Sequence, residues 1–301
     1  MGDRGARPAA RPVRRRQLTH AGGPAASGTT GQSDHAVPIR WYEASPARTA
    51  DTPTLLWLHG GGFFRGGLDQ PEAHAVAQEL ARLGVPVATV DHRLAPVPGL
   101  AWVRQRAGRP RVRFPLPLDD VLQAYRTVAA RSPDGVVLGG ASAGACLAAA
   151  TTLRALDDGS SPPAGAVFAY GFFHPVHPRH HDARRRSRRH RRITHAPWAL
   201  DVMNRNYVGR GGGLSDRFAF PGGHDVGGFP RALFINAEHD NMAASGDLFA
   251  AELGAAGVDV AHHVLPGTRH AFLNRPALTE FSTATAMIAS WIRGTAGPAD
   301  R

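Results

Sequence analysis

The pentapeptide Gly-Ala-Ser-Ala-Gly at residues 140–144 places Ser142 where a serine can act as a nucleophile. A short run of β-formers at residues 136–138 precedes it, and an Ala-rich segment that predicts a helix follows it. Gly140 and Gly144 lie two positions on either side of the serine, which allows a sharp strand-to-helix turn that presents the hydroxyl above the sheet. An ordinary Gly/Ala-rich turn explains the pentapeptide equally well, because short motifs have many false positives.

Two later residues supply the base and the acid that a serine nucleophile needs. Asp240 follows a predicted strand at residues 231–236, and His270 follows another at residues 258–264. The chain order serine, aspartate, histidine on the ends of successive strands is typical of such a site. Taken singly, Asp240 also fits a helix N-cap and His270 an ordinary loop histidine. Glu238 is the competing acid, and we prefer Asp240 because it lies further out on the loop.

Three consecutive glycines suit an oxyanion hole. Gly60, Gly61 and Gly62 follow His59 and a continuous apolar run at residues 54–58, which predicts a strand buried on both faces. Glycines free the backbone to turn its N–H groups toward one point, where they can stabilise developing negative charge. A flexible loop or a phosphate-binding turn is the alternative. The chain lacks the G-x-G-x-x-G and Gly-Lys-Ser/Thr patterns at this loop, which disfavours phosphate.

Four ordered motifs resemble those of the hormone-sensitive-lipase-like group of α/β-hydrolase esterases. They are HGGG at residues 59–62, DHRLAP at residues 91–96, the serine pentapeptide at residues 140–144, and the pair Asp240 and His270. The resemblance extends over residues 50–293. It implies that Ser142 is the nucleophile, His270 the base and Asp240 the residue that orients the base.

The resemblance also implies an oxyanion hole formed by the backbone N–H groups of Gly61, Gly62 and Ala143. Gly60, together with the two outer glycines of the serine pentapeptide, then supports these motifs. His59 shapes the glycine loop in this interpretation and takes no part in proton transfer.

The chain departs from the family pattern in three places. The usual Asp-Ser-Ala-Gly-Gly is Ala-Ser-Ala-Gly-Ala at residues 141–145, and the usual Asp-Pro-Leu at the acid is Asp-Asn-Met at residues 240–242. Residues 1–35 replace the N-terminal helices that normally help to cap the pocket. The first two departures leave the chemistry intact, whereas the third changes the part of the chain that bears on the lid and the substrate preference.

The alternation of strands and helices predicts an α/β-hydrolase fold, with a mostly parallel central sheet and helices on both faces. We expect one such domain at residues 36–295. A small lid insertion at about residues 172–213 interrupts the alternation and carries aromatic side chains. Residues 1–35 are rich in Arg, Pro and Gly and hold almost no large apolar side chains, so we expect them to be disordered.

The net charge of +11 comes from arginine alone, because all 35 basic residues are Arg. Three stretches hold the excess, at residues 1–16, 104–113 and 179–192, and the rest of the chain is net acidic. These stretches lack the interleaved aromatic residues of a single-strand nucleic-acid groove. We therefore predict solvated or disordered tracts and no nucleic-acid partner. The loss of apolar periodicity at residues 177–192 also suggests a frame-shifted insertion.

These features predict a serine carboxylic-ester hydrolase that forms an acyl-enzyme and prefers short acyl groups, acetyl above all. Phe63, Phe64 and the modest lid indicate a small acyl pocket. An amide hydrolase that removes the N-acetyl group of a secondary metabolite would use the same residues. A non-catalytic small-molecule binder on this fold is disfavoured because such proteins typically lose the histidine that His270 provides.

The remaining expectations concern partners and location. We expect a small-molecule ester or acetylated substrate, a monomer or homodimer, no cofactor and no metal, because the lid histidines lack metal-ligand spacing. No run approaches the ~18 apolar residues of a membrane span, so no membrane partner is predicted. No apolar stretch follows the arginines at residues 14–16, which favours the cytoplasm over secretion. Cys146, the single cysteine, is predicted to be a buried core residue.

Overall fold

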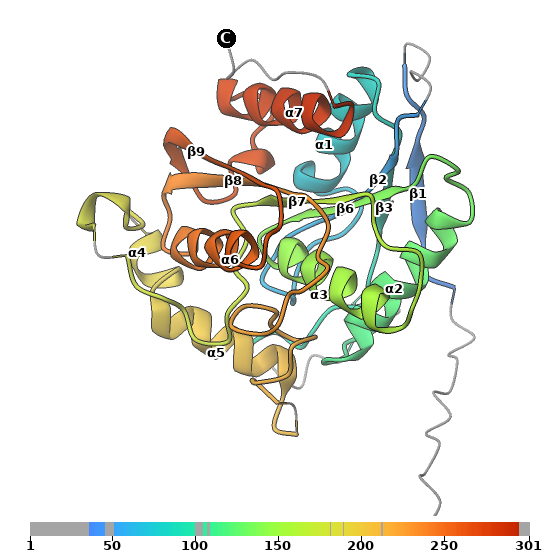
Figure 1. Cartoon of the computed structure of the whole chain (residues 1–301). Helices are drawn as coiled ribbons and strands as arrows, with labels where there is room; N and C mark the ends of the chain where they lie inside the picture. Colours follow the sequence, from blue (N-terminus) through green and yellow to red (C-terminus); the bar gives the residue numbers. More distant parts are fainter. Residues whose placement is uncertain are drawn as a thin grey trace, which may run out of the picture. The chain divides into compact units, whose positions relative to one another are not determined.

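A central sheet of seven strands organises the described part of the chain, in the order β1-β3-β2-β6-β7-β8-β9 (Figure 1). The computed structural model describes residues 36–45, 51–99, 105–106, 109–180, 182–188, 190–211 and 213–294. The strands are β1 (Ile39–Tyr42), β2 (Thr54–Leu58), β3 (Val87–Val90), β6 (Val136–Ala141), β7 (Gly165–Ala169), β8 (Ala232–His239) and β9 (Val260–Arg269). β1 is antiparallel to β3, and every other neighbouring pair is parallel. This is the mostly parallel sheet that the sequence predicts.

Two strands, β4 (Gln105–Arg106) and β5 (Arg109–Pro110), pair with each other outside this sheet. The chain divides into the units Met1–Ala36 and Val37–Arg301, and the named elements all belong to the second. The predicted disorder of residues 1–35, including the arginine-rich stretch at residues 1–16, concerns a segment outside the described residues. The domain boundary at residue 36 stays a prediction.

Helices cover both faces of the sheet, and each face has its own apolar core (Figure 1). On one face lie α1 (Pro71–Arg82) and α7 (Thr279–Ile292); on the other lie α2 (Leu116–Ala129), α3 (Ala143–Asp157) and α6 (Ala243–Ala255). Successive strand residues point to opposite faces. Accordingly, Leu56 and Leu58 of β2 pack in the core with α2, α3 and α6, whereas Leu55 and Trp57 pack with α1 and α7.

Two strands continue past their predicted ends. β8 and β9 remain paired as far as His239 and Arg269, with an irregularity in register between Ala237 and His239. The predicted strand before His270 ended at residue 264, because residues 266–269 lack an apolar pattern, yet the backbone ladder needs no apolar side chain. The longer ladder carries the chain directly to residues 240 and 270.

The lid insertion contains a 3-10 turn, η1 (Ala183–Arg185), and two helices, α4 (Arg191–Thr194) and α5 (Pro197–Val208). The arginine-rich run in it is only partly solvated, in contrast to the prediction. His177 and Ser187 are buried, and the Arg185 guanidinium forms an ion pair with Asp247 of α6 at 2.7 Å. Polar contacts with the rest of the domain thus keep parts of the arginine-rich run buried, although its composition predicts exposure to solvent.

Two further predictions concern the interior and the membrane. Cys146 of α3 is buried, as predicted, and burial raises the pKa of its thiol well above the ordinary value. None of the described helices is long and apolar enough to cross a membrane.

Candidate active site

Ser142 lies at the turn between β6 and α3, in a backbone conformation that non-glycine residues rarely adopt. Its φ is 53° and its ψ is −119°, and the side chain is buried. Such strain costs about 1–3 kcal/mol and is typical of functional sites. A Cβ on Gly140 or Gly144 would lie only 2.8 or 2.3 Å from the carbonyl oxygen of Leu58. Glycine at both positions therefore allows the turn to pack against the end of β2.

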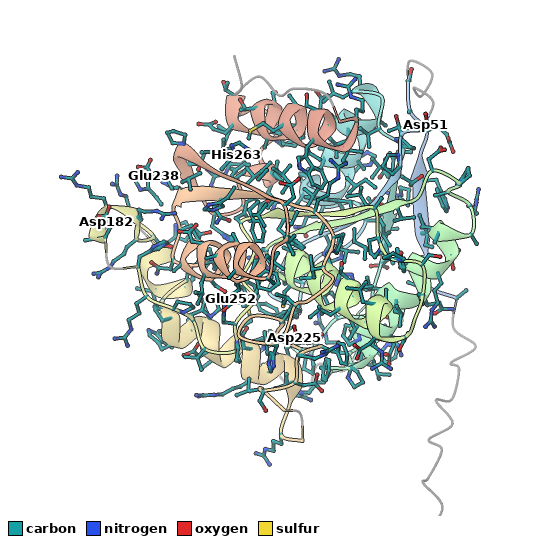
Figure 2. The ribbon with its side chains drawn as sticks, in the orientation of Figure 1. Asp51, Asp182, Asp225, Glu238, Glu252 and His263 are labelled. Atoms are coloured by element: carbon teal, nitrogen blue, oxygen red, sulfur yellow. The ribbon has the colours of Figure 1, made fainter. Side chains whose placement is uncertain are left out.

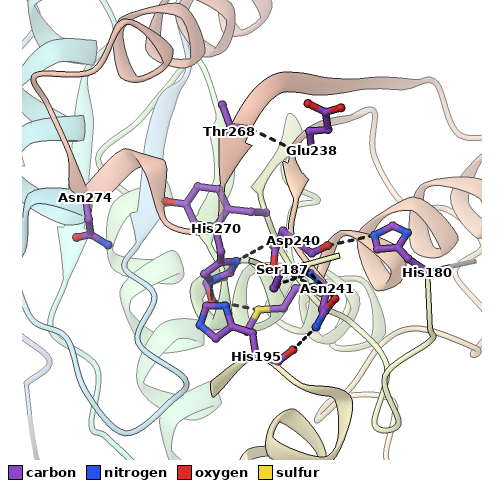
Figure 3. A network of polar contacts seen from close by, with 12 residues as sticks. His180, Ser187, His195, Glu238, Asp240, Asn241, Thr268, His270 and Asn274 are labelled. Carbon is purple, nitrogen blue, oxygen red and sulfur yellow. Dashed lines mark hydrogen bonds and ion pairs between the residues drawn. The ribbon is translucent and has the colours of Figure 1, made fainter. Parts of the chain in front are cut away.

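Ser142, His270 and Asp240 form a continuous hydrogen-bonded line. Figure 3 shows the contact between His270 and Asp240. His270 Nδ1 donates to Asp240 Oδ2 at 2.6 Å, which leaves Nε2 to accept from the Ser142 hydroxyl at 3.0 Å. Both distances are within the range of proton transfer between a nucleophile, a base and its orienting acid. The three residues come from loops after three different strands, and the structure brings them together as the chain order predicts.

The surroundings of Asp240 favour its ionised form. Burial alone would raise the pKa of this fully buried carboxyl. The charge and hydrogen bond of His270, the charge of His195 and the N–H of Met242 outweigh burial and lower the pKa. Asp240 is therefore a carboxylate at neutral pH and can stabilise a positively charged His270.

Glu238, the competing acid, lies away from His270. Its carboxylate accepts the Gly267 N–H at 2.7 Å, and 38% of its side chain is exposed at the edge of β8 (Figure 2). Its backbone N–H donates to Thr268, as Figure 3 shows. The geometry favours Asp240 over Glu238.

The glycine loop forms one wall of the cavity into which Ser142 and His270 open. Gly61 and Gly62 both have positive φ angles, 118° and 62°. A Cβ on Gly61 would lie 2.0 Å from the Arg65 carbonyl oxygen, so no other residue fits there. Ala143 is the first residue of α3, and N–H groups at this end of a helix have no acceptor within the helix. These three residues are thus suited to donate to an oxyanion beside Ser142.

His59 holds the glycine loop from behind. Its Nδ1 hydrogen-bonds the Gly60 carbonyl at 2.8 Å, and its ring stacks on His92 with centroids 4.6 Å apart. Next to His92, Arg93 forms an ion pair with the buried Asp120 at 2.6 Å. This arrangement agrees with a shaping role for His59 and gives residues 91–96 a structural one.

Glu72 of α1 is a central residue that the sequence did not reveal. It is 1% exposed, and its carboxylate accepts four hydrogen bonds. The donors are Gly60 N (2.7 Å), Gln70 Nε2 (3.0 Å), Tyr170 Oη (2.6 Å) and Asn274 Nδ2 (3.0 Å). A buried carboxylate needs such partners. Glu72 thereby ties the glycine loop to η2 (Phe272–Asn274), which directly follows the candidate base.

Tyr170 extends this network to the candidate base. Its ring contacts His270 edge-on, with centroids 4.9 Å apart. Burial, and then the neighbouring Glu72, raise the pKa of Tyr170 well above its ordinary value. The phenol therefore stays protonated and donates a hydrogen bond to the Glu72 carboxylate. No local motif marks Glu72 or Tyr170, because their contact joins residues far apart in the sequence.

The lid reaches the same site through Asn241, the residue after Asp240. Asn241 Nδ2 donates to the His195 carbonyl at 2.7 Å, and the His195 ring lies edge-on to His270 with centroids 4.8 Å apart (Figure 3). Asn241 and Ser187 exchange two hydrogen bonds, N to Oγ at 3.0 Å and N to Oδ1 at 3.1 Å. The sequence held one clue to this contact. Asn241 stands where the family's Asp-Pro-Leu has proline, and proline has no backbone N–H that could donate to Ser187.

A metal ion fits this arrangement poorly. His195, Asp240 and His270 place possible ligand atoms within 4.8 Å of one another. Asp240, however, directs its two oxygens to His270 Nδ1 and to the Met242 N–H. Both carboxylate oxygens of Asp240 thus already accept hydrogen bonds, so the three residues are better suited to proton transfer than to metal coordination.

The cavity has a volume of about 690 Å³, in the range of pockets for small organic ligands. Its apolar lining includes Phe64, Leu200, Met203 and Met242, and the Met242 sulfur lies 3.9 Å from Ser142 Oγ. Phe63, in contrast to the prediction, is absent from this lining. It is buried and stacks on Tyr207 of the lid, with ring centroids 3.9 Å apart, so it packs the lid against the domain.

Comparison with known proteins gives consistent similarities. A family profile described as the alpha/beta hydrolase fold matches residues 105–274. The carboxylesterase NlhH of Mycobacterium tuberculosis is 28% identical, over 79% of this chain and 72% of its own. The ethyl acetate hydrolase of Pseudomonas putida is 28% identical, over 83% of this chain and 76% of its own. A solved esterase from the bacterial hormone-sensitive lipase family matches with a TM-score of 0.70 and 25% identity, over 87% of this chain and 82% of that one.

Proposed function

This chain belongs to the alpha/beta hydrolase fold family, among its hormone-sensitive-lipase-like esterases, and we propose that it hydrolyses short-acyl carboxylic esters through Ser142, His270 and Asp240. The observation that carries the proposal is the buried line from Asp240 to His270 to Ser142, at 2.6 and 3.0 Å, which opens into a cavity. A base held in this way gives a serine hydroxyl useful reactivity at neutral pH.

In the first half of the reaction, Ser142 Oγ attacks the ester carbonyl carbon and passes its proton to His270 Nε2. The N–H groups of Gly61, Gly62 and Ala143 receive the oxyanion; each such donor contributes about 10²–10³-fold to the rate in other hydrolases. His270 then gives the proton to the departing alcohol as the carbon–oxygen bond breaks. The acyl group stays on Ser142 as an ester.

In the second half, water attacks the acyl carbon of the acyl-enzyme while His270 Nε2 takes one of its protons. The new oxyanion collapses, the carboxylic acid leaves, and the proton returns to Ser142 Oγ. Asp240 remains ionised throughout and stabilises the imidazolium that forms in each half. These two half-reactions consume only the ester and water.

The cavity supports a preference for short acyl groups, acetyl above all. Leu200 and Met203 of α5 and Met242 of the acid loop belong to its lining. The Met242 sulfur, 3.9 Å from Ser142 Oγ, narrows the space beside the nucleophile. The similarity to a relative named as an ethyl acetate hydrolase supports the same preference.

The test compares p-nitrophenyl acetate, butyrate and octanoate hydrolysis by the wild type, by Ser142→Ala and by Ser282→Ala, which changes an exposed serine of α7. We expect kcat/KM to fall with acyl length, to fall by about 10⁴-fold or more in Ser142→Ala, and to stay unchanged in Ser282→Ala. Equal activity in Ser142→Ala would overturn the triad. Cleavage of an N-acetyl amide but of no ester would favour the amide hydrolase instead.

A further inference from the structure

The lid exposes an unusual amount of apolar surface. Of the large apolar side chains that are exposed in the described part of the chain, four lie between residues 176 and 202. They are Val176 (63% exposed), Ile193 (66%), Trp198 (63%) and Val202 (46%). Single exposed apolar side chains are common, but a group on one segment indicates an interaction site.

The segment that carries these side chains forms part of the wall of the candidate active-site cavity. Val202 itself lines the cavity, while Ile193 and Trp198 each precede a lining residue, Thr194 and Ala199. Trp198 and Val202 are four residues apart on α5 and therefore share one face of the helix. Val176 is held near this face, because the next residue donates its backbone N–H to Asp201 at 3.1 Å.

The same segment is strongly basic. Residues 176–205 contain nine arginines and two acidic residues, both aspartates. Arg184, Arg186, Arg188 and Arg205 are exposed, and Figure 2 shows the adjacent Asp182 projecting outward from the lid. Asp201 faces His177, and the two aspartates together leave the segment with a formal net charge of +7 (nine arginines less two aspartates). We call residues 176–205, with their exposed apolar and arginine side chains, the cationic rim.

We propose that the cationic rim docks on the surface of an anionic lipid bilayer. Exposed tryptophan and isoleucine side chains partition into the headgroup region, and arginines around them attract anionic headgroups, which is the combination found in interfacial helices. The sequence prediction of no membrane partner rested on the lack of a spanning segment, and docking at an interface requires none. Under the proposed function, docking places the cavity mouth where esters dissolved in the bilayer can enter it.

Two other occupants are disfavoured by charge and by chemistry. A symmetric pair of chains would set the rim against itself, and arginines facing arginines repel. A nucleic acid would satisfy the arginines but would leave Val176, Ile193 and Val202 without apolar partners. An anionic bilayer satisfies both kinds of side chain at once.

The test is co-sedimentation of the full chain with vesicles of phosphatidylcholine alone and of phosphatidylcholine with about one third phosphatidylglycerol. We expect binding to the second kind only, weakened by added salt. The double variant Ile193→Ser/Trp198→Ser should bind at least about tenfold more weakly. The variant Arg184→Gln/Arg188→Gln should lose about fivefold per arginine.

Leu248→Ser is the matched control, since it removes a 42% exposed leucine of α6 outside the rim, and it should bind like the wild type. Binding is measured without substrate, so its outcome is independent of the proposed hydrolysis. The proposal is overturned if no variant differs from the wild type, or if natively folded protein ignores anionic vesicles. Dimerisation, or binding to duplex DNA, that is lost in the rim variants while vesicles stay unbound would assign the rim to that occupant instead.

Discussion

Asn241 donates its side-chain amide to the backbone carbonyl of His195 at 2.7 Å and thereby fastens the lid to the loop that carries the candidate acid, Asp240. Asn241 and Ser187 add two more hydrogen bonds, and His180 Nε2 donates to the Asp240 carbonyl at 3.1 Å. The lid and the candidate acid are therefore one hydrogen-bonded unit. A substitution that breaks these hydrogen bonds in the lid should therefore also disturb the position of Asp240.

We predict that Asn241→Ala lowers kcat/KM about tenfold or more, because His195 is no longer held against His270 and the cavity wall loosens. Ser187→Ala should have a smaller effect in the same direction. Since both variants break the same contact, the double variant should lose less than the sum of the two in free energy. Steady-state kinetics of the three variants measures this, and additive effects would show that the two residues act separately.

Glu72 gives a second prediction, about the position of the glycine loop. Glu72→Gln keeps the shape of the side chain but replaces one acceptor oxygen by a donor, so a buried donor loses its partner. We expect kcat to fall about tenfold to a hundredfold with little change in KM, and stability to fall by about 1–3 kcal/mol.

The matched control for Glu72 is Glu79→Gln on the same helix, where the surface pair with Arg82 contributes little to stability. Kinetics and urea unfolding of both variants provide the comparison. If Glu72→Gln behaved like Glu79→Gln in kcat, the carboxylate would have no part in positioning the loop.

Gly61 separates backbone strain from crowding at the site. In Gly61→Ala the new Cβ would clash with the Arg65 carbonyl oxygen, and the backbone φ is also positive. In Gly84→Ala the φ is likewise positive, at 87°, but no atom lies within 4 Å of the new Cβ. Both variants should lose about 1 kcal/mol or more of stability. Only Gly61→Ala should lose activity, by about a hundredfold or more, because its N–H is displaced from the oxyanion position. Similar activities of the two variants would argue against an oxyanion role for this loop.

Asp247 gives a prediction about acid stability. Burial by itself would raise the pKa of Asp247. Hydrogen bonds from His262, Arg185 and Asn236 have the larger, opposite effect, and the pKa falls to about 2. A lowered pKa in the folded state adds stability above the unfolded value of about 3.9, and this contribution disappears as the pH falls toward about 2. With allowance for solvent screening, the contribution is about 1–2 kcal/mol.

Urea unfolding between about pH 6 and pH 2 measures the effect of Asp247. Asp247→Asn should be less stable than the wild type at the upper end of this range, and the difference should shrink toward the lower end. Asp225→Asn, a change at an exposed aspartate, should follow the wild-type profile. A constant difference across the range would mean that the ion pair with Arg185 does not set the acid stability of the lid.

The sequence predicted the fold well because the buried strands are nearly continuous apolar runs; β2 occupies the predicted residues 54–58. It also brought Ser142, Asp240 and His270 into one hypothesis, since each follows a strand of a parallel sheet. The contacts that complete the site were not predictable. Glu72 lies 202 residues from Asn274 in the chain, and no local pattern records such a distance.

The lid was the least predictable segment. Its Arg/His composition indicates solvation, and an apolar pattern is missing at residues 177–192. Its buried positions depend instead on individual polar partners on the domain, such as Asp247 for Arg185 and Asn241 for Ser187. Such pairing is decided by three-dimensional geometry, which composition does not record.

The identity of the nucleophile is tested most directly by trapping it. Treatment with diethyl p-nitrophenyl phosphate transfers the diethylphosphoryl group to a reactive serine oxygen and releases p-nitrophenolate, and peptide mass spectrometry locates the adduct. We predict one adduct per chain, on Ser142, with loss of esterase activity in proportion, and no adduct in natively folded His270→Ala. Inactivation with the phosphoryl group on another residue, or full labelling of Ser142 without loss of activity, would contradict the proposed triad.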